Sequence, residues 1–69
     1  MYLWKFEIIL HSGQEIVGYD KNDFIDSRQV GDAFIAGNCN DIIGLGNKDG
    51  TAHIFIRKSE IAVMTISAG

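Results

Sequence analysis

An alternation of apolar side chains at the start of the sequence constrains the fold more than any other feature. Residues 2–10 read YLWKFEIIL, and every even position carries an apolar side chain. Since side chains on one face of a β-strand recur with a period of two, this segment predicts a half-buried strand. Turn residues follow, with Gly13 suited to a positive φ, and a second strand is predicted over residues 15–20. The two segments predict a hairpin, and Gly18 indicates a bulge or a sharp bend.

One helix is predicted near the middle of the chain. Asp26 is of the N-cap type, and Gln29 lies three residues later, at capping-box spacing. Val30 and Phe34 fall on one helical face, and Gly37 suits the position after the last turn. We therefore expect one short helix at about residues 27–36.

Three more strands are predicted after the helix, over residues 42–46, 51–57 and 61–67. The Asp-Gly dipeptide at positions 49 and 50 is a strong hairpin signal between the first two. The last segment, IAVMTIS, is apolar on both faces. Two arrangements account for this: its outer face meets a second subunit, or the helix covers that face within one domain.

The predicted order of elements is β-β-α-β-β-β, in a single domain over residues 1–69. Five short strands joined by tight turns predict a mainly β (α+β) fold. We expect a small five-stranded antiparallel bent sheet or barrel.

A chain of 69 residues gains limited stability from its own core. Cys39 is the single cysteine, so no disulfide within the chain reinforces the fold, and we interpret it as a small packing residue. One cysteine and two histidines make a poor set of zinc ligands, and neither a metal nor a cofactor is expected. We predict a homo-oligomer, whose interface would use the aromatic first strand if that strand lies at a sheet edge.

The formal net charge of −3 bounds the partners. Binding of duplex DNA usually needs a basic surface that releases counterions, so no duplex DNA is expected, while RNA or a small anion stays open. No run approaches the roughly 18 apolar residues that span a bilayer, and the first residues lack a basic n-region. We predict a cytoplasmic protein without a signal peptide and without a membrane partner.

Histidine and serine residues form no recognisable catalytic pattern. His11 lies in a predicted turn, and we interpret His53 as a partly buried strand residue. Neither has an evident partner for nucleophilic catalysis, and no serine stands in a nucleophile elbow. We therefore expect a binding protein and not an enzyme.

Five polar residues are the candidate ligand-binding residues. Arg28 stands at the predicted start of the helix, where free backbone N–H groups favour an anion. Asn38 and Asn40 follow the helix, and their amides suit the edge of a base. Arg57 and Lys58 are the only adjacent basic pair and suit a phosphate or an acidic partner. Each also has an interpretation without a ligand: Arg28 as an ordinary surface residue, the two asparagines as turn formers, and the basic pair as charges that end a strand.

Two stretches carry a resemblance to a known fold. Residues 10–18 have the spacing L-x-x-G-x-x-x-x-G, and residues 56–61 place a basic turn before the last strand. On these the chain resembles the Sm fold of Sm, Lsm and Hfq proteins, one of the small SH3-like barrels, which implies a small β-barrel. The chain departs from the family in its helix, in Lys58 where glycine is usual, and in Ser59 where Hfq carries an RNA-contacting histidine. The Asp-x-x-x-Asn base-reading loop is missing too, so the family's RNA site does not carry over, and only Arg57 and Lys58 map near it.

The chain also resembles short, acidic, β-rich proteins encoded by phages and prophages of Gram-positive bacteria. The shared cues are the strand–glycine turn–strand opening, the D-S-x-x-V helix start and the closing I-R-K-S-E-I-A stretch. The resemblance implies a non-enzymatic, oligomeric binding protein, a phage-type accessory or defence-inhibiting protein. It would sequester a small nucleotide-like ligand or occlude a host protein. Independently of the resemblance, Tyr19 or Tyr2 is a candidate among the aromatic residues for stacking a base. The alternatives are an Sm/Hfq-like RNA-binding ring and a structural subunit of a larger particle.

Overall fold

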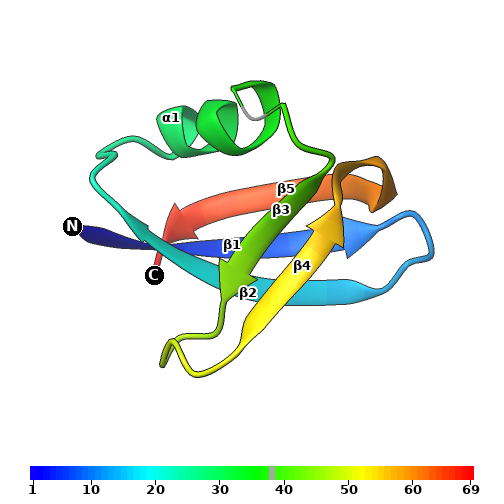
Figure 1. Ribbon diagram of the computed structural model, residues 1–69, viewed down its shortest axis with the longest axis horizontal. Helices are drawn as coiled ribbons and strands as arrows, with labels where there is room; N and C mark the ends of the chain where they lie inside the picture. Colours follow the sequence, from blue (N-terminus) through cyan, green and yellow to red (C-terminus); the bar gives the residue numbers. More distant parts are fainter. Residues whose placement is uncertain (38) are drawn as a thin grey trace.

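The computed structural model describes residues 1–37 and 39–69 as five antiparallel strands and one helical segment (Figure 1). The elements are β1 (Tyr2–Leu10), β2 (Glu15–Asn22), α1 (Ser27–Gly31), the π-helical turn η1 (Asp32–Ala36), β3 (Ile42–Gly46), β4 (His53–Arg57), the 3-10 turn η2 (Lys58–Glu60) and β5 (Ile61–Ala68). The predicted order of elements is confirmed. The predicted helix at residues 27–36 corresponds to α1 and η1 together.

The first strand lies inside the sheet, whose strand order is β4-β3-β2-β1-β5. Phe6 of β1 pairs with Gly18 of β2 on one side and with Ile66 of β5 on the other. The even-numbered side chains Trp4 and Phe6 are buried in the core. The condition set for an aromatic subunit interface on the first strand is therefore not met, because both backbone edges of β1 are already paired within the chain.

Gly18 marks a bend and not a bulge. The pairing of β1 with β2 runs through Gly18 without a register shift, whereas the irregularity lies between Ile9 and Leu10, opposite β5. A Cβ atom on Gly18 would lie 2.7 Å from the Cβ of Leu45 in β3, so only glycine admits this approach. The sheet bends here, and β3 and β4 cross over β1 and β2 (Figure 1). Since β4 and β5 are the two ends of the sheet and do not pair, the fold is a bent sheet and not a closed barrel.

The helix covers the inner face of the bent sheet. Val30 is fully buried, and the ring of Phe34 lies 4.9 Å from the ring of Phe6, centroid to centroid. A Cβ atom on Gly31 would lie 3.4 Å from Cδ1 of Ile66, which places α1 against β5. The arrangement with the helix over the outer face of the last strand is therefore wrong, because its apolar stripe packs on the core, and Val63 on the outer face of β5 is exposed.

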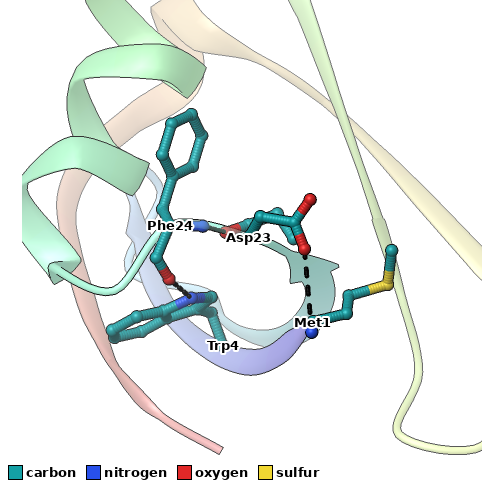
Figure 2. A network of polar contacts seen from close by, with 5 residues as sticks. Met1, Trp4, Asp23 and Phe24 are labelled. Atoms are coloured by element: carbon teal, nitrogen blue, oxygen red, sulfur yellow. Dashed lines mark hydrogen bonds and ion pairs between the residues drawn. The ribbon is translucent and has the colours of Figure 1, made fainter.

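Polar contacts attach the segment after β2 to the first strand (Figure 2). The indole Nε1 of Trp4 donates to the carbonyl oxygen of Phe24 at 3.0 Å. The amino group of Met1 lies 3.6 Å from Oδ1 of Asp23. The buried indole thus has the hydrogen-bond partner that it needs, and the chain is held where it turns toward the helix.

The helix has defined contacts at both ends. Oδ1 of Asp26 accepts from the backbone N–H of Arg28 at 2.9 Å, which confirms the predicted N-cap. At the other end, Nζ of Lys58 donates to the carbonyl oxygen of Ile35 at 3.0 Å.

The helical segments that the structure describes fall short of the length and apolar character that a membrane-spanning helix needs.

Both predicted turn glycines have a positive φ, 91° at Gly13 and 76° at Gly50. The strand after the second turn begins at His53, two residues later than predicted. Oδ1 of Asn47 accepts from the backbone N–H groups of Thr51 and Ala52, at 2.8 and 3.3 Å. These bonds keep both residues in the turn.

Candidate functional site

Three aromatic side chains lie on the outer face of the sheet, on the side away from the helix. We call Tyr19, His53 and Phe55 the outer aromatic strip. In β4 the side chain of Ile56 is 5% exposed, and that of Phe55 is 72% exposed. Because side chains alternate along a strand, this burial places His53, Phe55 and Arg57 together on the outer face.

Two glycines of β3 lie beside the strip. Gly44 pairs with Phe55, and Gly46 pairs with His53. A Cβ atom on Gly44 would lie 3.1 Å from Cε1 of Phe55, so the phenyl ring leans over a residue that has no side chain. The interpretation of His53 as partly buried is wrong, because Gly46 offers nothing to cover it and β4 is an outer strand of the sheet.

The rings of His53 and Phe55 are almost parallel. Their centroids are 6.5 Å apart, and their planes meet at 21°. This separation lies near the upper end of the range of about 4.5–7 Å for interacting aromatic pairs. Both rings are exposed to solvent, so each has π surface that a third planar group can contact.

Tyr19 completes the strip from β2. It pairs with Gly46, which in turn pairs with His53, so the three positions form one row across three strands. Neighbouring strands lie about 4.8 Å apart, which puts the backbones of Tyr19 and His53 about 10 Å apart with no side chain between them. A groove of about 320 Å³ occupies this place. It is lined by residues of the strip, Tyr19 and His53, and by the charged residues Asp20, Lys21, Lys48 and Asp49.

Most of the basic residues of the chain lie on this face or at its rim. Four of the six lie on it or at its rim, namely Lys5, Lys21, Lys48 and Arg57. Nζ of Lys5 lies 3.8 Å from Oε1 of Glu7. In the described part of the chain, Lys21, Lys48 and Arg57 make no ion pair. The face therefore offers cationic groups beside aromatic rings, although the chain carries a net charge of −3.

The structure brings together three of the predicted ligand-binding residues. Arg57 ends β4 and lies in a shallow depression with Asp41 and Ile42. The backbone N–H of Lys58 donates to the carbonyl oxygen of Asp41 at 2.8 Å. Asn40 is exposed and precedes Asp41, so it lies near this pair. The bond from Lys58 to Ile35 gives that side chain a structural role, which the sequence did not reveal.

The other two predicted residues are not shown to join this group. Arg28 precedes Ile35, the partner of Lys58, by seven residues or about two helical turns. Its backbone N–H is bonded to the carboxylate of Asp26, so a negatively charged group already occupies that donor. Asn38 lies outside the described residues.

Two single residues complete the comparison with the sequence. His11 is exposed in its turn, as predicted. The interpretation of Cys39 as a packing residue is wrong, because the thiol is exposed in the loop after the helix, while helix residues such as Phe34 pack on the core. Within residues 1–37 and 39–69, no group of three or more His, Cys, Asp or Glu side chains is placed to hold a metal ion.

Comparison with known proteins gives no matching family model, no matching curated protein and no matching solved structure. The site therefore rests on its geometry. From the sequence, Tyr19 or Tyr2 is a candidate for base stacking, whereas Phe55 is given no such role. The available signal was the alternation over residues 53–57, in which apolar Ile54 and Ile56 leave Phe55 on the opposite face, beside a strand that contains two glycines.

Proposed function

We propose that the protein is a non-enzymatic binding protein that stacks the base of a nucleotide-like ligand on the outer aromatic strip. The observation that carries the proposal is Phe55, a phenylalanine in mid-strand that is 72% exposed and lies almost parallel to His53. Burying a phenylalanine side chain is worth about 1.5–3 kcal/mol, so covering this ring with a flat group is favourable. Stacking of a base on an aromatic side chain contributes about 1–3 kcal/mol.

The surroundings of the strip support a small ligand. Gly46, which pairs with His53, leaves room for a planar group beside the strip, because a Cβ atom there would meet only backbone oxygens, whereas the ring of Phe55 already covers Gly44. The groove holds Lys21 and Lys48 but also two carboxylates, so its charges nearly balance. Such a surface suits a ligand with few charges better than the dense phosphates of a duplex.

The wider role stays a proposal. A phage-type accessory protein that sequesters such a ligand in the cytoplasm, as a homo-oligomer, agrees with the strand–glycine turn–strand opening and with the small antiparallel sheet. Kinship with Sm-like or SH3-like barrels is proposed on the same features. Of the two residues that map near the Sm RNA site, Arg57 lies on the same face of β4 as Phe55, whereas the side chain of Lys58 bonds to Ile35.

The test is a titration of the ¹⁵N-labelled protein with adenosine, adenosine monophosphate (AMP) and ribose 5-phosphate, followed by NMR. We expect the two adenine compounds to shift the amide signals of β3 and β4, and ribose 5-phosphate to shift them far less. Phe55→Ala should weaken binding by at least about fivefold, the lower limit of one stacked base. Ile25→Ala is the matched control, because Ile25 is 74% exposed and lies away from the strip.

Two results would contradict the proposal. One is the absence of shifts with either adenine compound. The other is binding that Phe55→Ala leaves unchanged, which would place the ligand elsewhere. After the first result, occlusion of a protein partner becomes the better hypothesis; after the second, the protein still binds a nucleotide-like ligand but not on the strip.

A further inference from the structure

We infer that the site holds a nucleoside phosphate in one orientation, with its phosphate in the groove between Lys21 and Lys48 and its base on His53 and Phe55. The inference rests on the proposed stacking function and adds a phosphate site, which stacking alone does not require. The ligand class is then a nucleotide, as opposed to a free base, a nucleoside or another flat aromatic compound.

The stacking surface and the two lysines belong to one depression. His53 of β4, Lys21 of β2 and Lys48 of the turn between β3 and β4 all line the groove of about 320 Å³. Gly46 forms its floor between Tyr19 and His53. A base that lies on the rings of β4 therefore has an open path for its sugar and phosphate into the groove.

In the described part of the chain, the ammonium groups of Lys21 and Lys48 are available to a ligand. Lys21 and Lys48 are both exposed, and no ion pair or hydrogen bond is formed by either ammonium group there. Lysine acts on a phosphate as a flexible point charge with three donors. Lys5, on the same face, differs because it lies 3.8 Å from Glu7.

Two carboxylates limit how much negative charge the groove accepts. Oδ2 of Asp20 accepts a hydrogen bond from Nδ2 of Asn22 at 2.8 Å, so one of its oxygens is occupied. Asp49 is exposed and follows Lys48 directly in the turn. Its negative charge repels a phosphate bound in the groove. We therefore expect removal of the Asp49 charge to tighten phosphate binding and removal of the neighbouring Lys48 charge to weaken it.

The reverse orientation would direct the phosphate toward Arg57, at the other end of β4. Arg57 shares its depression with Asp41, so one cation there is offset by one carboxylate. The groove end has two cations, and one of its two carboxylates is engaged by Asn22. Formal charges cancel at both ends, but the groove supplies two cationic donors where the depression at Arg57 supplies one, and this favours the groove.

The experiment compares adenosine, AMP and ADP by NMR titration at low and high salt, with five charge variants and Phe55→Ala. We expect AMP and ADP to bind more tightly than adenosine, and salt to reduce that difference. Lys21→Gln and Lys48→Gln should each weaken AMP binding about two- to fivefold and leave adenosine unchanged. Asp49→Asn should tighten AMP binding, and Lys5→Gln, the matched control, should have little effect.

The contrary results separate this inference from the proposed function. Equal binding of adenosine and AMP, with no effect of either lysine variant, overturns the phosphate site while a Phe55-dependent affinity still supports base stacking. Loss of the AMP preference in Arg57→Gln alone overturns the orientation. Absence of binding by all three compounds overturns both proposals.

Discussion

The side chain of Leu45 packs directly on the backbone of Gly18, from β3 onto β2. A Cβ atom on Gly18 would lie 2.7 Å from Cβ and 2.8 Å from Cδ1 of Leu45, closer than side-chain atoms approach one another. Leu45 is 1% exposed, so it has no free space to retreat into. This contact holds the part of the sheet with the aromatic rings of β4 against the part formed by β1 and β2.

We expect Gly18→Ala to destabilise the protein. Overpacking of a filled core costs about 1–3 kcal/mol, and for a domain of this size each kcal/mol lowers Tm by about 4–8 °C. Thermal unfolding followed by circular dichroism measures the change. Gly46→Ala is the control, since its Cβ would meet its nearest neighbour at an ordinary 3.6 Å. Equal Tm values for the two variants would contradict the close packing of Leu45 of β3 on Gly18 of β2.

We expect Phe34→Ala to loosen the helix from the sheet. The ring of Phe34 lies 4.9 Å from that of the fully buried Phe6, and its loss removes the aromatic contact between η1 and β1. Because Phe34 is only partly buried, the cost should be about 2 kcal/mol, below the 3–5 kcal/mol of a fully buried phenylalanine. Urea unfolding gives the value. Ile35→Ala, at a neighbouring position that is 41% exposed, should cost much less, and a similar loss in both variants would contradict the packing described here.

The adjacent residues Arg57 and Lys58 should behave differently. Nζ of Lys58 donates to the carbonyl oxygen of Ile35 at the end of the helical segment, where a cation stabilises a helix by about 0.3–1 kcal/mol. Lys58→Gln should therefore speed amide hydrogen exchange in residues 32–36, whereas Arg57→Gln should leave it unchanged. Exchange measured by NMR distinguishes the two. If only Arg57→Gln speeds the exchange, the residue that stabilises the end of the helix is Arg57 and not Lys58.

Self-association is predicted from the length of the chain and stays a prediction. We expect size-exclusion chromatography with light scattering to give a mass that is a multiple of 7.6 kDa. Since association of folded chains stabilises them by mass action, Tm should also rise with protein concentration. A mass of one chain, together with a Tm that does not depend on concentration, would contradict the prediction.

Much of the fold was predictable because neighbouring residues determine it. The alternation over residues 2–10 marks β1, and the Asp-Gly dipeptide marks the turn before β4. The cap at Asp26 and the spacing of Val30 and Phe34 mark the helix. The start of β4 was less predictable, because it depends on hydrogen bonds from the side chain of Asn47 to residues several positions later.

The sequence by itself determined which segments are strands and which side chains of each strand share a face, because both follow from a period of two along the backbone. Beyond the two hairpins, it did not determine which strands are neighbours, since the pairing of β2 with β3 and of β1 with β5 depends on contacts between distant segments. The tertiary structure placed Tyr19, Gly46 and His53 in one row across three strands and left β4 at the edge of the sheet. Only this pairing brings Tyr19 and Lys21 together with Lys48, His53 and Phe55, because these two groups are more than 20 residues apart in the chain.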